Sequence, residues 1–413
     1  MRFYKVKIIL ITSFLAIFSV QPSTAITNGT FAPSGSTVKV ISNWGNCSGA
    51  VWKINIVITA AHCVFDTTGV LREGLSVNAF INGAWTKVEV AGIKAPIDFK
   101  NASSYIDITS QVSAKDIAFI ILKNDLGDKE NFSSPRIATT SDWESYKLGS
   151  TAFAIYGYGY TSETNFAGNQ PVAGIFTLDL TYSQGNKDWA VLRSNASATC
   201  HGDSGGPVVA YSQNENAFIL VGVMQGGIGT GNCSDMQRNG GSINMFMKIS
   251  SFSDLAKSTE ITNDKYVIGK TALDAAFNKL DEFRTKLSDL GDFADQLSPA
   301  SKKRIFENNK DVAKINGYID EFENKVNDLE EILNESMDFT YINSGVLEAN
   351  SPTVGKNFEA NVKPFVTKIN PLFTKISKTL PSFVCTSDSL IKDLPLSKKC
   401  PKGYTKTELT KPF

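Results

Sequence analysis

Histidine is scarce in this chain, which contains only His62 and His201. Its six cysteines include no CxxC pair, so a closed zinc site, the competing interpretation of the cysteines, is not expected. We predict no bound metal and no other cofactor. Charge of one sign is also not in excess, because 41 Lys and Arg balance 41 Asp and Glu. Such a chain gives no indication that it binds nucleic acid.

Long hydrophobic runs are missing too, apart from one near the N-terminus. Residues 8–20 form an apolar run behind three basic residues, and Ser23 and Ala25 occupy the small-residue positions that precede a cleavage site. The run is shorter than the ~20 residues of a membrane-spanning helix. We predict an export signal over residues 1–25, with a membrane anchor as the alternative. The mature protein should be secreted, either extracellular or in the periplasm or at the cell surface, and should have no membrane span.

Export places the cysteines in an oxidising compartment, where an even number favours three disulfides. The Lys-rich segment 385–413 is too short to fold without a bridge, which predicts a disulfide between Cys385 and Cys400. Sequence alone leaves the pairing of the other four cysteines open. These are Cys47, Cys63, Cys200 and Cys233.

The length of 413 residues favours two domains, and the residue pattern changes once along the chain. From residue 26 to about 255, short runs of Val, Ile, Phe and Tyr alternate with Gly, Asn and Ser, which is typical of an all-β barrel or sandwich. Beyond about residue 254, glycine becomes rare and apolar residues recur in steps of three and four. We predict a β domain over residues 26–258, a helical module over 259–384 and a closing segment over 385–413, with a short polar linker between 255 and 264.

Three apolar stripes predict the helices of the module, which should form a small antiparallel bundle or hairpin. Ser298 and Pro299 are typical of an N-cap followed by proline at the first helical position. Pro364 and Pro371 should kink or divide the third helix. The stripes are Leu273, Phe277, Leu280, Phe283, Leu287, Leu290 and Phe293; Ile315, Ile319, Phe322, Val326, Leu329 and Leu333; and Phe358, Val362, Phe365, Ile369 and Ile376.

Three sequence motifs occur in the order His, Asp, Ser. They are "TAAHC" at 59–63, "KDIAFIIL" at 115–122 and "CHGDSGGP" at 200–207. Together they resemble the chymotrypsin-like serine proteases, and the resemblance covers residues 26 to about 255. It implies a mainly β fold of two antiparallel barrels and the hydrolysis of peptide bonds.

The chemistry explains why these residue types occur together. A serine hydroxyl is a poor nucleophile at neutral pH and needs a base that titrates near that pH. His62 is the candidate base for Ser204, because His201 lies within the serine motif itself. Asp116 should hold the His62 tautomer and stabilise the imidazolium formed during acylation. We predict that these three residues form a catalytic triad that acts through an acyl-enzyme.

The glycines around the serine predict an oxyanion hole. They allow a turn tight enough to aim the N–H groups of Gly202 and Ser204 at the developing oxyanion. The alternative is a glycine-rich turn without a catalytic role. The resemblance also implies that Cys47 pairs with Cys63 and Cys200 with Cys233.

Departures from the family pattern concern substrate specificity. Trypsin-like members place an acidic residue at the pocket floor six positions before the serine, where this chain has Ala198. The segment Gln225–Gly226–Gly227 replaces the usual Ser-Trp-Gly, and its edge can still pair with substrate backbone. Asn244 aligns opposite Ala198 and should offer its amide to the pocket. An uncharged pocket of moderate size follows, which should accept Arg and Lys poorly and medium apolar or uncharged polar residues such as Leu, Met or Gln better.

The sequence "ITNGT" at 26–30 resembles the new N-terminus that activates members of this family. The ammonium of Ile26 should then pair with Asp203, since a buried unpaired carboxylate is costly. No propeptide separates the signal from Ile26, so signal peptidase itself should free the activating amine. The alternative is a cut elsewhere, for instance after Ser23, followed by trimming.

We therefore expect a secreted serine endopeptidase that acts on proteins or peptides. The alternative is a catalytically weak binding or adhesion protein that uses a protease scaffold. For the helical module, one interpretation is a bundle that braces the protease, and the other is a module for cell-surface attachment or self-association.

Overall fold

The computed structural model divides the chain into two compact units. One contains the chain as far as Thr259 together with Phe339–Glu348, and the other contains Glu260–Asp338 and Ala349–Phe413. The predicted export signal, residues 1–25, lies outside the described residues. The structure describes residues 26, 30–31, 36–66, 68–96, 99, 115–127, 135–148, 151–160, 167–183, 186–228, 242–337, 339–341, 346–349, 354–387, 390–393 and 399–413.

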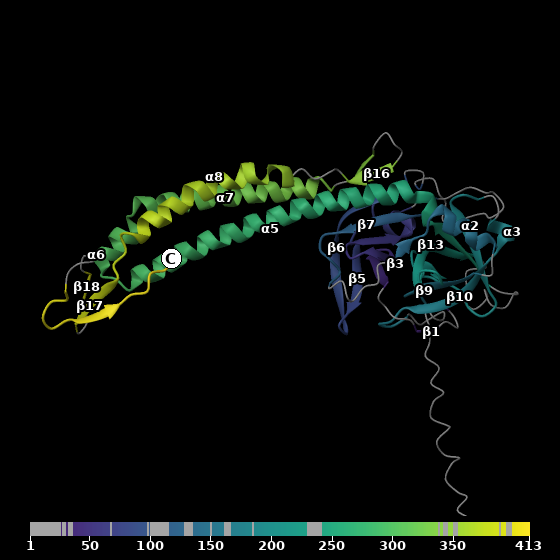
Figure 1. Ribbon diagram of the computed structural model, residues 1–413, viewed down its shortest axis with the longest axis horizontal. Helices are drawn as coiled ribbons and strands as arrows, with labels where there is room; N and C mark the ends of the chain where they lie inside the picture. Colours follow the sequence, from purple (N-terminus) through teal and green to yellow (C-terminus); the bar gives the residue numbers. More distant parts are fainter. Residues whose placement is uncertain are drawn as a thin grey trace, which may run out of the picture. The chain divides into compact units, whose positions relative to one another are not determined.

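Six antiparallel strands close the first β-barrel (Figure 1). Apolar side chains alternate along the strands and fill the interior, as a half-buried strand requires. Val38, Val57, Val77 and Ile120 are among these buried residues. In barrel order the strands are β2 (Thr37–Ser42), β3 (Gly45–Lys53), β4 (Ile56–Thr59), β7 (Ala118–Leu122), β6 (Ala84–Pro96) and β5 (Ser76–Ile81).

A second barrel of six antiparallel strands follows, so the predicted double-barrel fold is confirmed. The short strands β1 (Thr30–Phe31) and β8 (Arg136–Ile137) pair with β10 and β13, and helices α2 (Thr140–Leu148) and α3 (Leu180–Ser183) connect the strands. In barrel order the strands are β9 (Ala152–Gly157), β10 (Val172–Leu178), β11 (Trp189–Ser194), β14 (Ser242–Lys248), β13 (Ala217–Ile228) and β12 (Pro207–Ser212).

The two barrels pack on each other through an apolar core of their own. Ile58 and Phe119 from the first barrel share this core with Val209, Val223 and Met245 from the second. The core continues into the short helix η3 (Ile249–Phe252) that follows the last barrel strand. Loops from both barrels therefore meet along one line, where the candidate site lies.

A later segment of the chain adds two strands to the first barrel. β15 (Phe339–Tyr341) and β16 (Val346–Ala349) extend its sheet beyond β6. β16 runs antiparallel to β6, with Val346 opposite Pro96 and Leu347 opposite Ala95. This segment lies within the predicted helical module, residues 259–384, but in the structure it pairs with the first barrel.

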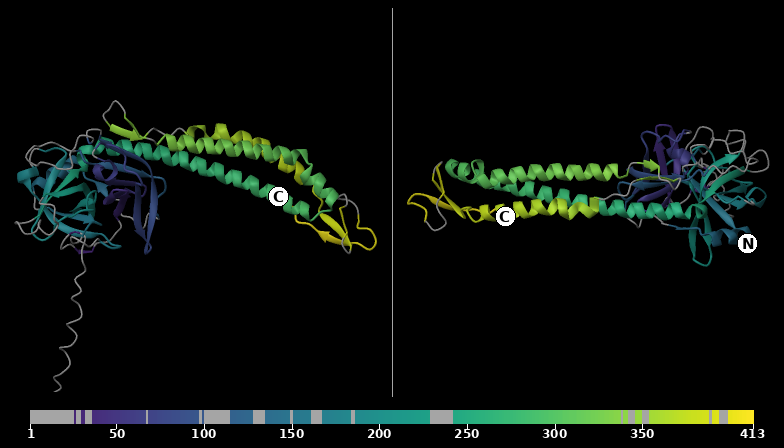
Figure 2. Two further views of the ribbon diagram at one scale, coloured as in Figure 1. Left: turned by 180° about the vertical axis from the view of Figure 1, so that it is seen from behind. Right: turned by 90° about the horizontal axis from the view of Figure 1, so that it is seen from above.

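Long helices make up most of the second unit, and α7 and α8 lie side by side in Figures 1 and 2. Phe283 of α5 contacts Phe322 of α7 and Phe373 of α8, each at 6.3 Å between ring centroids. The second predicted stripe is buried throughout. The helices are α5 (Ser253–Asp295), α6 (Pro299–Lys302), the π-helical turn η4 (Lys303–Glu307), α7 (Lys310–Glu335) and α8 (Val354–Ser377).

The predicted polar linker is wrong, and the predicted cap at Ser298 is confirmed. α5 runs unbroken through the stretch predicted as a polar linker, because Leu255, Thr259, Thr262 and Tyr266 supply buried side chains at helical spacing. α8 contains both Pro364 and Pro371 and is not divided, so only the kink remains of that prediction. Ser298 caps α6 as predicted, and its side chain accepts from the Ser301 N–H.

The C-terminal segment forms a small antiparallel sheet of β17 (Phe383–Ser387), β18 (Leu390–Asp393) and β19 (Thr405–Glu408). The predicted disulfide between Cys385 and Cys400 is present. In the part of the chain that the structure describes, no helix combines the length and the apolar character needed to cross a membrane.

Candidate active site

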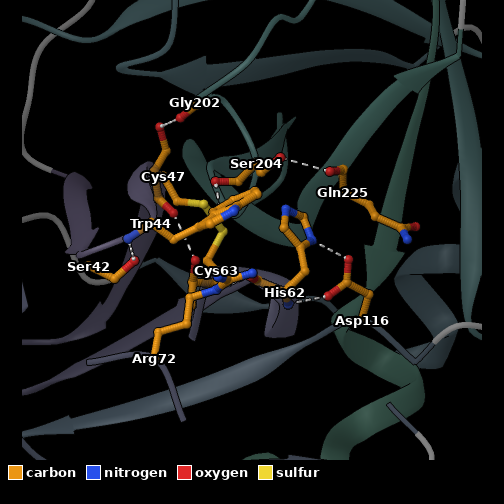
Figure 3. The surroundings of a disulfide bond; sticks show 12 residues. Ser42, Trp44, Cys47, His62, Cys63, Arg72, Asp116, Gly202, Ser204 and Gln225 are labelled. Atoms are coloured by element: carbon orange, nitrogen blue, oxygen red, sulfur yellow. Dashed lines mark hydrogen bonds and ion pairs between the residues drawn. A yellow bond between two sulfur atoms is a disulfide. The ribbon is translucent and has the colours of Figure 1, made fainter. Parts of the chain in front are cut away.

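His62 and Asp116 come from neighbouring strand ends of the first barrel. His62 lies on the short helix α1 (Ala61–Val64) just after β4, and Asp116 lies just before β7, which pairs with β4. One carboxylate oxygen of Asp116 lies 2.6 Å from His62 Nδ1, and the other accepts from the His62 backbone N–H at 2.8 Å. The two bonds fix the ring so that Nε2 is directed away from Asp116 (Figure 3).

The surroundings of His62 raise its pKa above the ordinary value of 6.5. Burial lowers the pKa, but the charge of Asp116 and the hydrogen bond to it together outweigh that effect, while Arg72 opposes them weakly. The side chain is still 27% exposed, so a substrate can reach the ring. A base held in this way accepts a proton readily and keeps the resulting imidazolium stable.

Ser204 sits on the loop before β12, between the two barrels. Its carbonyl accepts from the Ser48 N–H at 2.8 Å, and its hydroxyl donates to the carbonyl oxygen of Gln225 at 2.9 Å. Among the described residues, this is the only hydrogen bond of the hydroxyl. The structure thus brings Ser204 beside His62, but the hydroxyl must turn from Gln225 toward Nε2 before it can transfer a proton (Figure 3).

The loop before Ser204 presents two backbone N–H groups. Those of Gly202 and Ser204 donate to no other described group, whereas the intervening Asp203 N–H bonds to Cys200. Gly202 has φ +91°, a conformation that side chains rarely adopt. Free donors next to a nucleophile are what an oxyanion requires.

Ser48 holds this loop in place through hydrogen bonds, and it is not among the residues predicted from the sequence. Its buried hydroxyl donates to the Gly202 carbonyl at 2.8 Å and accepts from the Tyr158 N–H at 2.9 Å. With its backbone bond to Ser204, the residue links three segments from two barrels. The only signal in the sequence is its position directly after Cys47, because its partners lie more than a hundred residues away.

Asp203 is fully buried, and its carboxylate accepts only two backbone N–H groups among the described residues, from Gly159 at 2.9 Å and Cys200 at 2.8 Å. Burial raises its pKa to about 8 in spite of these two bonds. Ile26 is also fully buried, in the core of the second barrel. In the full chain its nitrogen belongs to a peptide bond and carries no charge.

The carboxylate of Asp203 also needs space beside the strand that it faces. A Cβ atom at Gly157 would come within 1.9 Å of Asp203 Oδ1. Only glycine therefore fits at position 157, and a Cβ atom at Gly159 would likewise come within 2.6 Å of Asp203, which accounts for both glycines of "YGYGYT".

The residues assigned to the specificity pocket differ in one respect from expectation. Ala198 and Asn244 are both fully buried, and Asn244 pairs with Gly227 between β14 and β13. Asn244 Oδ1 accepts from the Thr199 hydroxyl at 2.6 Å, and Nδ2 donates to Ser242 at 2.9 Å. The amide that the sequence analysis expected to face a substrate is therefore engaged within the protein. Gln225 and Gly226 lie at a bulge in β13.

Two of the disulfides bear on the site. The predicted pair Cys47–Cys63 is present, directly beside His62 (Figure 3). Cys200 is also disulfide-bonded, and its predicted partner Cys233 lies outside the described residues. Among the described residues, Cys47, His62 and Cys63 form the only cluster with metal-ligand atoms close together, and sulfurs joined in a disulfide are not thiolate ligands.

Comparison with known proteins agrees with this geometry. The family model named Trypsin matches residues 26–255, which is more than half of the chain. The chain belongs to the trypsin family. Trypsin alpha of Drosophila melanogaster is 24% identical over 198 residues, which cover 45% of this chain and 68% of the relative. Trypsin alpha-4 of Lucilia cuprina is 25% identical over 198 residues, with the same two shares.

The trypsin-family domain contains every residue assigned above to catalysis, and it is a serine protease domain by family. The long helices α7 and α8 and the C-terminal sheet lie outside the matched range. They are an addition to the family domain.

Proposed function

We propose that the protein is a secreted serine endopeptidase that cleaves proteins or peptides. The observation that carries the proposal is the His62–Asp116 pair beside Ser204, with two free N–H groups next to the hydroxyl. This arrangement provides a base, a nucleophile and an oxyanion site within one small volume.

In the proposed mechanism, the Ser204 hydroxyl leaves the Gln225 carbonyl and donates to His62 Nε2. It then attacks the substrate carbonyl while His62 takes its proton, and the N–H groups of Gly202 and Ser204 bind the oxyanion. His62 next protonates the leaving amine, which departs and leaves an acyl-enzyme. Water repeats the sequence on the ester and restores Ser204.

Labelling of the serine provides the direct test. A fluorophosphonate should modify the folded wild-type protein at Ser204, and the Ser204→Ala variant should remain unmodified. Peptide hydrolysis should be lost in the wild type once Ser204 is labelled, and it should be absent in the Ser204→Ala variant. A folded wild-type protein that neither reacts nor cleaves would favour the alternative, a binding or adhesion protein on a protease scaffold.

For specificity, we propose an uncharged residue on the acyl side of the scissile bond. Ala198 brings no carboxylate, and Asn244 is already bonded to Thr199 and Ser242, so a cationic side chain would lose its hydration without a partner. Medium side chains such as Leu, Met or Gln should be preferred. Peptides that differ only at this residue provide the test, and a tenfold preference for Arg over Leu, about 1.4 kcal/mol, would contradict the proposal.

For activation, we propose that removal of the export signal frees the Ile26 amine, which then pairs with Asp203. The burial of both residues and the raised pKa of Asp203 support this, because a cation would stabilise the carboxylate there. N-terminal sequencing of active secreted protein should begin at Ile26. Active protein that begins elsewhere would refute direct release by signal peptidase.

A further inference from the structure

Trp44 and Arg72 form a side-chain pair next to the catalytic residues, and the mechanism uses neither. The Arg72 guanidinium lies 4.0 Å from the Trp44 ring centroid, and Nε donates to the His62 carbonyl at 3.1 Å. The two loops that carry them are joined by a hydrogen bond from the Asn43 N–H to the Glu73 carbonyl. Trp44 is nevertheless 64% exposed, which is unusual for a tryptophan.

The pair lies on the side of the site from which the leaving amine departs. On the acyl side, the strand edge at Gln225 is the expected partner of substrate backbone. Figure 3 shows Ser204 and His62 between Gln225 on one side and Trp44, with the Cys47–Cys63 disulfide, on the other. A substrate that passes the nucleophile must therefore continue over Trp44 and Arg72.

Arg72 has unused hydrogen-bonding capacity. Its only hydrogen bond among the described residues uses Nε, and it forms no ion pair there. Asp66 is the acid that acts on it electrostatically, but it forms no ion pair with Arg72, and its Oδ1 accepts from Thr68 and Val70 instead. The two Nη nitrogens can thus form a fork toward a carboxylate, while the indole face holds the guanidinium plane in place.

We propose that Trp44 and Arg72 form a binding subsite for an acidic side chain in the first or second residue after the scissile bond. The subsite rests on the proposed peptidase function and adds a substrate class to it. Arg72 is fixed to the backbone of the catalytic histidine, so a carboxylate bound there also holds the leaving segment in register with Ser204.

Matched quenched-fluorescence peptides test this subsite. They share one acyl side with Leu before the scissile bond, and they carry Glu, Gln or Lys at the first or the second position after it. In the wild type, kcat/KM for a Glu peptide should exceed that for its Gln partner about fivefold at low salt, and added salt should reduce the ratio. Because each comparison is made within one enzyme, a partly unfolded preparation does not change the ratio.

The variants make the test specific. Arg72→Gln should bring the Glu-to-Gln ratio to about one, and Arg72→Glu should favour the Lys peptide instead. Lys87→Gln removes an exposed cation elsewhere on the same barrel and should keep the wild-type ratio. Equal rates for the Glu and Gln peptides in the wild type would overturn the subsite while leaving the peptidase function intact. A wild type that cleaves no peptide would contradict the peptidase function, and the subsite with it.

Discussion

Replacing Ser48 by alanine should lower the stability of the fold and also disturb the alignment of the oxyanion donors. A matched control variant distinguishes the two effects. The substitution removes a hydroxyl that bonds to the Gly202 carbonyl and to the Tyr158 N–H, at 2.8 and 2.9 Å. It leaves the Cβ atom and the backbone bond to Ser204 in place. The Gly202 carbonyl then loses its partner, so the backbone torsions of Gly202, which set the direction of its N–H relative to that carbonyl, are held less firmly.

The magnitude follows from the two bonds. Each buried partner left unsatisfied costs about 1–3 kcal/mol, so the loss of two should lower the free energy of unfolding by about 2–6 kcal/mol. Complete loss of an oxyanion donor costs about 2.7–4 kcal/mol in the barrier. A misdirected donor should cost less, and we expect kcat to fall about 10- to 100-fold with a smaller change in KM.

Ser183→Ala is the matched control, because the buried Ser183 hydroxyl likewise bonds to the backbone N–H and carbonyl of one residue, Val191. Urea unfolding should show a loss of stability in both variants. Peptide hydrolysis, measured where both are fully folded, should be impaired in Ser48→Ala alone. A folded Ser48→Ala protein with wild-type kcat would refute the view that Ser48 aligns the oxyanion donors.

Further predictions concern the triad, pH and the domain boundary. Ser204→Ala should fold and lose peptide turnover by a factor of about 10³ or more, and wild-type turnover in this variant would show the triad assignment to be wrong. Because the pKa of His62 is raised and the base must be neutral, the acid limb of the kcat/KM profile should have its midpoint above pH 6.5, and a midpoint below it would contradict the contacts described. Asp203 has a pKa of about 8 in the folded full chain against 3.8 as the reference, so the folded form retains a proton that the unfolded form loses. In a chain with residues before Ile26, the free energy of unfolding should therefore decrease as pH rises from 4 to 8. In a chain that begins at Ile26, it should decrease less. Equal pH dependence of the two chains in urea unfolding would argue against the ion pair. A chain that ends at residue 258 keeps all twelve barrel strands, so it should still cleave peptides, although the truncated protein should be less stable than the full chain. A truncated protein that is soluble and disulfide-bonded but inactive would show that the later segments are part of the catalytic fold.

The residues of the candidate active site could be selected from the sequence because chemistry restricts their identity. A nucleophilic serine requires a base and an orienting acid, and the motifs around His62, Asp116 and Ser204 carry local glycine and cysteine signals that a single sequence displays. The strands and helices could be predicted because their apolar periods differ. These features depend on neighbours a few residues apart.

Other features depend on distant partners and could not be predicted in this way. Ser48 acts through groups far along the chain, and the Asn244 amide oxygen accepts from Thr199, which lies 45 positions away. Pro364 should cost α8 about 3 kcal/mol by local rules. Burial of Val362, Ile369, Phe373 and Ile376 along the same helix offsets that cost.

The pairing of β16 with β6 has a consequence for the order of folding. Leu347 and Ala95 are separated by about 250 positions, so closing this contact in an unfolded chain carries a large loop entropy. Contacts of such long sequence separation form slowly, whereas each six-stranded barrel is built within a shorter stretch of chain. The barrels should therefore assemble first and leave the end of β6, at Ala95 and Pro96, open for pairing. The segment around β16 then pairs with this end only after the helices between Thr259 and Phe339 have folded and shortened the distance.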